Sequence, residues 1–512
     1  MSDSLYYKDA GGYFRTYLEN DFAAENGFKT TKADPSGLPS YDQINGLLPH
    51  PVWDGHEDEL KLYDYCWQTA FGNLRRPSEA SGFIRNYIDP AFNGNVFLWD
   101  SVFMLFFGLY GRRAFNFQGT LDNFYFKQHP DGFICREINE ETGEEQFQRY
   151  DPSGTGPNLL AWSEWRYYRF SGDESRLKRV FPVIAGYHRW LRNYRSWQDG
   201  SYYSTGWGCG MDNQPRFRQP YRFEFFHGFN SWIDTTCQQI LSAKLLVRIA
   251  EATGRTSDAA EFIGEAEKLT QLVNERMWNE DLGFYTDKYA DGGLSDVMTV
   301  GAFWALLAGI VPPERLKRFT SHLNDPATFC RPHRVPTLAA NSPYYCPDGG
   351  YWRGSVWSPT NYMVLEGLTA VDEHSLAAEI ADNHYANILE VFRKTGTVYE
   401  NYAPESPSRG VPSASSFVGW TGISGINVLL EYQLGIRADV PSNTIVWTIR
   451  QAERHGVMNY PFGEGTVNLI CEARKSSADR PQILITGNVS ASIQIHWPGG
   501  TFTVSCEPQE ST

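Results

Sequence analysis

The segment HEDELKLYDYCWQTAFGNL, residues 56–74, indicates the fold class, because its apolar side chains recur every three or four residues, as on one face of an α-helix. Those side chains are Leu60, Tyr63, Trp67, Phe71 and Leu74. Similar segments follow as far as Gly435, several with Gly, Pro, Asp or Ser at one end. They are residues 101–110, 113–128, 156–171, 174–195, 229–253, 257–278, 293–309, 312–324, 355–370, 373–394 and 419–434.

This succession of helices predicts paired packing, because antiparallel helices joined by short connections lie side by side. We therefore expect a mainly α fold over residues 56–437, an (α/α)6 toroid of inner and outer helices. Residues 1–55 are expected to form an N-terminal extension that packs on this barrel.

The pattern changes after Ala438, where short stretches rich in β-branched residues alternate with turn-forming residues. These stretches are residues 444–449, 466–473, 482–487, 492–499 and 501–506. Residues 438–512 are therefore predicted to form a small antiparallel β-domain, whose role the sequence leaves open. A chain of 512 residues is long enough for one large domain with a smaller one appended.

The charge balance argues against several kinds of partner. With 45 Lys and Arg against 60 Asp and Glu, the formal net charge is −15, which disfavours nucleic acid. We find no apolar run of membrane-spanning length and no export signal in the opening residues, so we expect a cytoplasmic protein without a membrane partner. The 8 cysteines show no metal-ligand spacing and are expected to be isolated thiols.

Aromatic residues make up 15% of the chain, more flat apolar surface than a core of this size requires. Sugar-binding clefts use such rings, because the C–H face of a pyranose packs on them, so we expect a small-molecule carbohydrate as partner. The same surplus would also serve an interface in a homo-oligomer, and the oligomeric state stays open. No cofactor motif appears, and we expect neither a cofactor nor a catalytic metal.

Two loops carry a lone carboxyl in unusual surroundings. Residues 206–216 (GWGCGMDNQPR) place Asp212 among glycines and near a tryptophan, where desolvation would raise its pKa. Residues 397–404 (TVYENYAP) place Glu400 near two tyrosines, which could orient a water for a catalytic base. Taken alone, Asp212 also fits a simple turn and Glu400 a surface position.

Two further segments combine aromatic and charged residues. In residues 95–101 (NVFLWDS), Asp100 either caps the following helix or accepts hydrogen bonds from two sugar hydroxyls, with Trp99 beneath the ring. In residues 349–359 (GGYWRGSVWSP), Arg353 stands among three aromatic residues. That combination suits a sugar platform, whereas core packing would not need the arginine.

Together these segments resemble glycoside hydrolase family 63 and its trehalase-like relatives. The motifs occur in the same order over roughly residues 90–435: FLWDSVF, KQHPDGFICRE, GMDNQPR, YWRGSVW, and YENYAP followed by GWTG. The resemblance implies an (α/α)6 barrel, an inverting mechanism, Asp212 as general acid and Glu400 as general base. It places Trp99, Asp100, Gln128, Trp352, Arg353 and Trp357 around the sugar, and we add Phe97, Arg216, Tyr402 and Trp420 from the same motifs. Gln214 stands where the family more often has Ser.

The expected reaction is exo hydrolysis of a small α-linked glucoside or mannoside, such as an oligosaccharide or a glycosylglycerate. Inversion requires the two carboxyls to stand roughly 6.5–9.5 Å apart, with Asp212 neutral and Glu400 ionised. The alternatives are a sugar epimerase, or a lyase or hydrolase acting on uronic acids, on the same helical toroid. Those chemistries need a proton shuttle, for which His129 and His227 lie nearest the motif loops. A third alternative is a carbohydrate-binding protein without catalysis, against which the presence of Asp212 and Glu400 argues.

Overall fold

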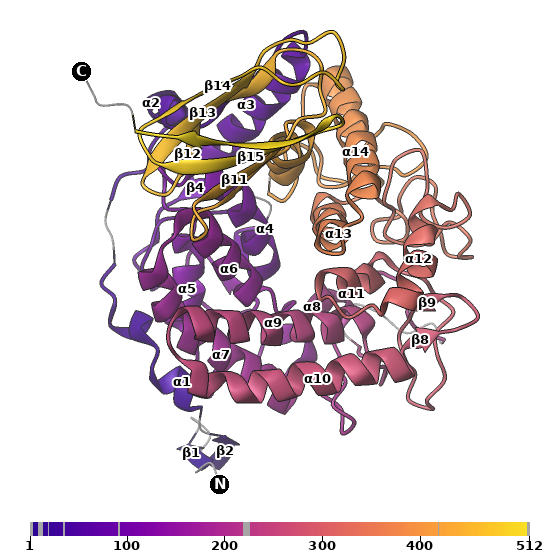
Figure 1. The fold of residues 1–512 in the computed structure, drawn as a ribbon. Coiled ribbons are helices and arrows are strands. Elements are labelled where there is room, and N and C mark those ends of the chain that lie inside the picture. The colour runs from indigo at the N-terminus through magenta and orange to yellow at the C-terminus, as the bar shows by residue number, and fades with distance from the viewer. Residues whose placement is uncertain are drawn as a thin grey trace.

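The computed structural model describes residues 4–8, 14–18, 20–33, 36–90, 93–218, 226–417 and 419–508. The described chain is mainly helical, with two β-sheets built largely from its C-terminal part (Figure 1). The long helices are α3 (Glu57–Gly72), α4 (Leu98–Gly108), α5 (Gly119–Lys127), α6 (Leu160–Ser171), α7 (Glu174–Tyr194), α9 (Ile233–Ala252), α10 (Ala259–Arg276), α12 (Pro313–Ser321), α13 (Ser358–Ala370), α14 (His374–Thr395) and the π-helix η8 (Ile423–Gln433). Short helices are α1 (Asp21–Ala24), α2 (Tyr41–Ile44), α8 (Gly206–Cys209) and α11 (Trp304–Leu307).

Each helical segment predicted from the sequence overlaps one of these helices, although 293–309 holds only the short α11 and the 3-10 turn before it. Six helices contact one another in a closed cycle. Each contacts the next in the order α4, α6, α9, α11, α13, η8, and η8 contacts α4 again. A second set packs outside them: α7 on α6 and α9, α10 on α9, α14 on α13 and η8, and α3 on η8 and α14.

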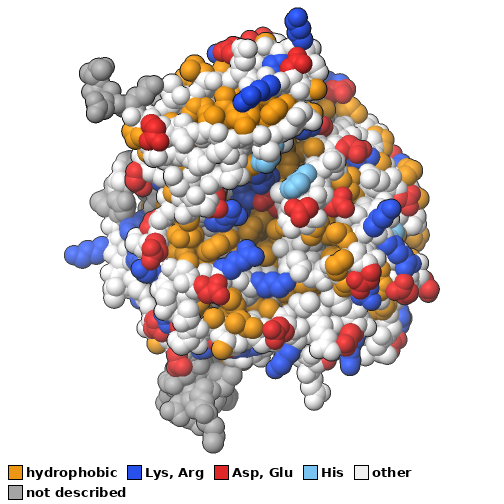
Figure 2. All heavy atoms as spheres, in the orientation of Figure 1, with side chains coloured by type: hydrophobic (Ala, Val, Ile, Leu, Met, Phe, Trp, Pro, Cys, Tyr) orange, Lys and Arg blue, Asp and Glu red, His pale blue; other side chains and the backbone are white. Residues whose placement is uncertain are grey.

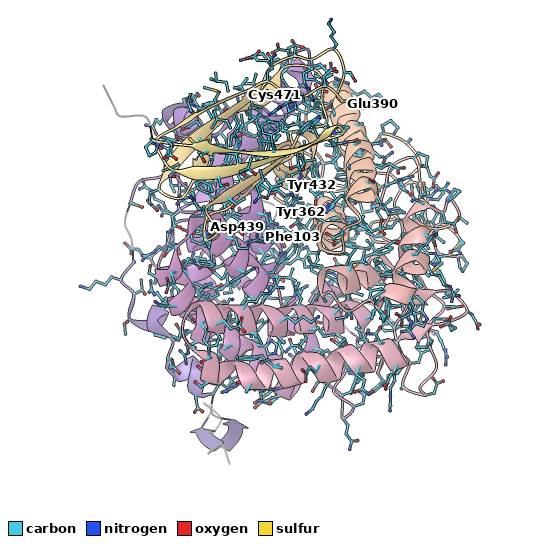
Figure 3. The ribbon with its side chains drawn as sticks, in the orientation of Figure 1. Phe103, Tyr362, Glu390, Tyr432, Asp439 and Cys471 are labelled. Carbon is cyan, nitrogen blue, oxygen red and sulfur yellow. The ribbon has the colours of Figure 1, made fainter. Side chains whose placement is uncertain are left out.

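The helix α4 is buried along its whole length, as expected for an inner helix that is apolar on every side. Its residue Phe106 packs against Phe103 at 5.7 Å between ring centroids and against Tyr362 of α13, also at 5.7 Å. Figure 3 shows Phe103, Tyr362 and Tyr432 in the central part of the molecule, below the C-terminal sheets. Aromatic contacts therefore fill the middle of the helical body.

The C-terminal strands form two four-stranded sheets. One has the order β10 (Ile436–Asp439), β11 (Thr444–Thr448), β15 (Ala491–Trp497), β16 (Gly500–Cys506), and the other β14 (Ile483–Gly487), β13 (Gly465–Cys471), β12 (His455–Phe462), β3 (His50–Trp53). The prediction of a purely antiparallel domain is wrong at one pairing, because β11 and β15 run parallel. The chain leaves the first sheet after β11, builds most of the second sheet, and returns as β15 in the same direction.

The predicted N-terminal extension contributes to both parts of the molecule. Strand β3 pairs antiparallel with β12 at the edge of the second sheet, and α1 packs on α7 through Phe22 and Phe181, whose ring centroids lie 5.7 Å apart. The remaining strands form two-stranded pairs: β1 (Ser4–Lys8) with β2 (Phe14–Leu18), β4 (Leu74–Arg75) with β5 (Tyr87–Ile88), β6 (Asn95–Phe97) with β7 (Glu137–Asn139), and β8 (Trp278–Asn279) with β9 (Phe284–Tyr285).

Figure 2 shows a hollow in the face between the C-terminal sheets and α9. It measures about 1290 Å³ and is lined by residues of α6, α9, α11, α13, α14, η8, β10, β11 and β15. Its carboxylates are paired with arginines, as in the ion pair between Asp439 and Arg169 at 2.8 Å. None of the helices in the described ranges is both long and apolar enough to cross a bilayer.

Candidate active site

A pocket of about 280 Å³ opens where α4, α6, α13 and η8 begin. It is lined by Asn93, Phe97, Trp99, Asp100, Arg136, Glu137, Gly156, Pro157, Trp207, Gly210, Asp212, Tyr351, Trp352, Glu400 and Trp420. The structure thus brings together both predicted catalytic carboxyls and five of the predicted sugar-binding residues, Phe97, Trp99, Asp100, Trp352 and Trp420.

The loop that carries Asp212 has a fixed course. The helix α8 begins where the Thr205 hydroxyl accepts a hydrogen bond from the Gly208 amide and ends at Gly210, whose φ is +76°. The positive φ favours glycine at position 210, and a Cβ atom there would make a tight contact of 3.2 Å with the Trp99 ring. One residue after Asp212, the Asn213 side chain donates to the carbonyl oxygen of Gly350 at 3.0 Å and accepts from the Trp352 amide at 2.9 Å. These two hydrogen bonds tie the loop that carries Asp212 to the segment that carries Tyr351 and Trp352.

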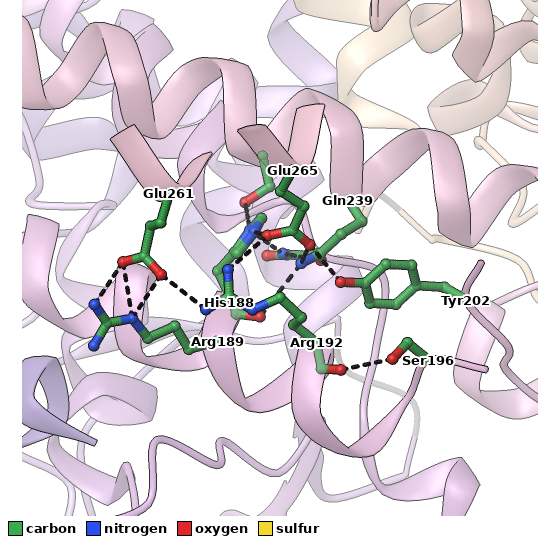
Figure 4. Close-up of polar contacts among 10 residues, drawn as sticks. His188, Arg189, Arg192, Ser196, Tyr202, Gln239, Glu261 and Glu265 are labelled. Atoms are coloured by element: carbon green, nitrogen blue, oxygen red, sulfur yellow. Dashed lines mark hydrogen bonds and ion pairs between the residues drawn. The ribbon is translucent and has the colours of Figure 1, made fainter. Parts of the chain in front are cut away.

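Figure 4 shows a polar network around Glu265 that includes Tyr202, in the segment before this loop. The hydroxyl of Tyr202, three residues before Thr205, donates to the carboxylate of Glu265 at 2.5 Å, and His188 and Arg192 contact the same carboxylate at 2.9 and 3.0 Å. Burial opposes ionisation of Glu265, but His188 and the Arg192 guanidinium outweigh it and lower the pKa of Glu265 to about 2. Hydrogen bonds to the Glu265 carboxylate thus fix Tyr202, in the segment that leads into the loop of Asp212.

Glu400 is held by two hydrogen-bond donors. The Tyr351 hydroxyl donates to its Oε1 at 3.0 Å and the Ala414 amide to its Oε2 at 3.1 Å. Burial raises the pKa of Glu400, while these two donors act in the opposite direction by stabilising the carboxylate. The Trp420 indole also donates to the Glu400 carbonyl oxygen at 2.8 Å, which fixes the backbone of this residue.

Asp100 is a third carboxyl in the same pocket, in the first turn of α4. It is only 4% exposed, and its Oδ1 is buried without a hydrogen-bond partner among the described residues. Burial above all, then the nearby charges of Glu400 and Asp212, raise the pKa of Asp100 well above its usual range. A buried acceptor without a donor is costly, so this oxygen is suited to a ligand hydroxyl.

The aromatic side of the pocket has two layers, with Trp352 at the pocket and Trp357 stacked behind it. Trp352 stacks on Trp357 with 3.9 Å between ring centroids and 6° between planes, and Trp357 lies 5.4 Å from Trp420. Trp357 is fully buried and does not line the pocket. It supports Trp352 from behind, whereas the sequence placed both beside the sugar.

Four other predicted sugar-binding residues do not line the pocket either. Buried Gln128 donates to the carbonyl oxygens of Gly132 and Val183. Buried Arg216 pairs with Asp234 and Asp287 and lies over the Trp232 ring, and buried Tyr402 accepts from the Tyr399 amide. Arg353 is partly buried, with its Nε lacking an acceptor in the described part of the chain.

Eight lining residues were not among the predicted ones, namely Asn93, Arg136, Glu137, Gly156, Pro157, Trp207, Gly210 and Tyr351. All except Asn93, Gly156 and Pro157 lie within the quoted motifs, so the motifs located five of them without indicating which side chains face the pocket. Arg136 pairs with Glu137 at 3.2 Å and donates to the Ser153 carbonyl oxygen at 2.7 Å.

The geometry of the pocket gives little support to the epimerase and uronic-acid lyase alternatives, which need a proton shuttle. His129 and His227 do not line the pocket, and His129 is engaged by Glu145 at 2.8 Å. Within the described residues, no group of three or more His, Cys, Asp or Glu side chains is placed to hold a metal ion. The pocket is lined by carboxyls, one arginine and aromatic rings, which are residue types typical of glycoside hydrolase active sites.

The comparison with known families agrees with this class. The family described as "Mannosylglycerate hydrolase MGH1-like glycoside hydrolase domain" matches residues 95–421, well over half of the chain. The chain belongs to this family, within glycoside hydrolase family 63, and is therefore a glycoside hydrolase.

Three relatives illustrate the range of the similarity. A probable mannosyl-oligosaccharide glucosidase of Schizosaccharomyces pombe is 26% identical over 54% of this chain, which matches only 34% of that protein. A mannosylglycerate hydrolase of Thermus thermophilus is 24% identical over 55% of this chain and 83% of its own length. The crystal structure of a family 63 mannosylglycerate hydrolase from Thermus thermophilus in complex with glucose superposes with a TM-score of 0.58 at 20% identity, covering 71% of this chain and 99% of that one. The structural likeness concerns the fold alone.

Proposed function

We propose that the protein is an inverting, exo-acting α-glycosidase that hydrolyses a small α-linked glucoside or mannoside. The observation that carries the proposal is that Asp212 and Glu400 line one pocket together with Asp100 and tryptophan rings. The closed cycle of contacts among α4, α6, α9, α11, α13 and η8 supports an (α/α)6 barrel as its frame.

The proposed mechanism gives the two carboxyls opposite tasks. Asp212 donates its proton to the departing glycosidic oxygen, and Glu400 removes a proton from the water that attacks the anomeric carbon. The Tyr351 hydroxyl and the Ala414 amide favour the ionised form of Glu400 that a base requires. Asp100 accepts hydrogen bonds from sugar hydroxyls while Trp352 packs on the ring, which binds one terminal sugar.

The volume of the pocket supports the exo mode. Small-molecule sites usually measure about 300–1,000 Å³, and 280 Å³ lies just below that range, which suits a single terminal sugar. The names of the relatives supply the candidate sugars, since one is named a mannosylglycerate hydrolase and another a probable mannosyl-oligosaccharide glucosidase. Mannosylglycerate, glucosylglycerate and short α-linked glucosides and mannosides are therefore the substrates to try first.

The test measures sugar release from this panel by the wild type, Asp212→Asn and Glu400→Gln. Each substitution keeps the shape of the side chain and removes its proton site, so we expect rates to fall by about 10²–10⁴-fold. Glu405→Gln is the matched control, because Glu405 lies on the same loop as Glu400 but pairs with Arg331 at 2.7 Å outside the pocket. Full activity of either pocket variant would refute its assigned role.

A second measurement tests inversion directly. Proton NMR of the reaction at early times reports the anomer released, and an α-linked substrate should yield the β-anomer first. Initial release of the α-anomer would refute inversion while leaving hydrolysis itself intact. Absence of release from every α-linked substrate would refute the proposed specificity.

A further inference from the structure

A second pocket, of about 420 Å³, lies at the other end of α4 from the catalytic pocket. Asp100 in the first turn of α4 lines the catalytic pocket, whereas Gly108, the last residue of α4, lines this one. The second pocket is lined by Arg85, Gly108, Leu109, Arg112, Asn116, Phe117, Gln118, Asp122, Tyr167, Asp173, Ser175, Arg176 and Arg179. It shares no residue with the catalytic pocket.

The lining carries a surplus of positive charge. Four arginines face two aspartates, and a third carboxylate, buried Glu164 behind the lining, pairs with Arg176 at 2.8 Å, so the balance stays positive through the other arginines. Asp173 is occupied as the N-cap of α7, where it accepts from the Arg176 amide at 2.9 Å. Asp122 is engaged by Arg176 at 2.9 Å and only loosely by Arg85 at 3.7 Å. On a chain with net charge −15, this concentration of arginines is local.

Arg112 has unmet hydrogen-bonding capacity. Its Nε and Nη2 are buried and have no acceptor among the described residues. Its Nη1 lies 4.0 Å from Glu464, whose side chain is 97% exposed and therefore well screened by solvent. Buried guanidinium donors without acceptors are costly, which indicates an acceptor supplied from outside the protein.

Among the four arginines of the lining, Arg179 has no carboxylate partner in the described part of the chain. It donates to the carbonyl oxygen of Gly27 and to the Thr31 hydroxyl, and its guanidinium lies 4.0 Å from the centroid of the Phe28 ring. Burial foremost lowers the pKa of Arg179, with Arg176 and Arg85 adding to the effect, so an anion in the pocket would relieve this repulsion.

We propose that this arginine pocket binds a phosphate group carried by a small molecule. Guanidinium groups match phosphate oxygens in a bidentate manner, and Ser175, Asn116 and Gln118 add neutral polar groups to the lining. A volume of 420 Å³ leaves room beyond the phosphate for a body of about the size of one sugar. The ligand class is a phosphate monoester, bound at a site separate from the catalytic carboxyls.

Isothermal titration calorimetry of the whole protein tests the proposal, with inorganic phosphate, glucose 6-phosphate and glucose as probes. Both phosphates should bind, and more weakly at high salt, whereas glucose should not bind in a way that depends on the arginines. Tighter binding of the ester than of inorganic phosphate places the sugar body in the pocket. Equal binding restricts the site to the phosphate group and still supports it.

Arg112→Gln and Arg179→Gln should each weaken phosphate binding at least about tenfold, because each removes a charged donor. Arg113→Gln is the matched control, since Arg113 is the exposed neighbour of Arg112, bonds Asn459 and does not line the pocket. If Arg112→Gln fails to fold, Arg179→Gln carries the test. Absence of phosphate binding, or equal binding by all three variants, would overturn the proposal.

Discussion

Tyr351→Phe is the sharpest test of the proposal that Glu400 acts as a base and that the Tyr351 hydroxyl favours its ionised form. The substitution removes one oxygen, and with it the hydrogen bond of 3.0 Å from the phenol to Glu400 Oε1. Burial, followed by the charges of Glu400 and Asp212, raises the pKa of Tyr351 far above neutrality, so the phenol keeps its proton and acts as the donor. Its loss should therefore destabilise the ionised form of Glu400 and leave the protonated form nearly unchanged.

The size of the effect follows from the energy of a hydrogen bond to a charged group, about 1.5–3 kcal/mol. Because one pKa unit corresponds to about 1.4 kcal/mol, the pKa of Glu400 should rise by about one to two units. A base works only when ionised, so activity should be lost at a higher pH on the acidic side. The acid limb of the kcat/KM profile for sugar release should move upward by the same one to two pH units, with a smaller change on the plateau.

Tyr345→Phe provides the matched control. The Tyr345 hydroxyl donates to Glu405 at 2.6 Å in the same way, but neither residue lines the pocket. Its pH profile should coincide with that of the wild type. An unmoved acid limb in Tyr351→Phe would refute the idea that this phenol sets the ionisation of the base.

Three further substitutions test other parts of the site. Asp100→Asn should lower kcat/KM by about 10–100-fold, measured by sugar release, because it removes a charged acceptor for sugar hydroxyls. Gly210→Ala should lower both activity and the melting temperature, because its Cβ would lie 3.2 Å from the Trp99 ring at a φ of +76°. Arg216→Met should cost about 3–5 kcal/mol in urea unfolding, because it leaves Asp234 buried without its cation. A variant at Arg216 with normal stability and lost sugar affinity would instead restore the sugar-binding role predicted from the sequence.

The helices were predictable because their apolar periodicity is strong and local. The strand β12 (His455–Phe462) was missed because it does not alternate in the usual way. Its Asn459 has a φ of +58° and its register with β13 shifts between Val457 and Tyr460, which is a bulge. Strand β3 was missed because its partner lies some 400 residues away, and no local pattern reports such a pairing.

The motifs located the pocket, but they could not separate residues that touch it from residues that support it. Trp352 and Trp357 belong to one motif, yet one lines the pocket and the other lies behind it. Arg216 has the residue type expected of a sugar ligand, but its guanidinium is neutralised by two buried aspartates. The direction of a side chain from an irregular loop depends on distant partners, which spacing along the chain does not encode.

The placement of donors explains why Glu400, and not Asp100, suits the role of base. Burial raises the pKa of both carboxyls, but only Glu400 has two donors that favour its ionised form. Asp100 Oδ1 lacks a donor among the described residues, so donors for it must come from the ligand. Sugar hydroxyls would supply them and lower the pKa of Asp100 on binding, which couples its ionisation to an occupied pocket. In the proposed mechanism, Glu400 thus has its donors in place before the substrate arrives, whereas Asp100 would become a good acceptor only through the sugar that it binds.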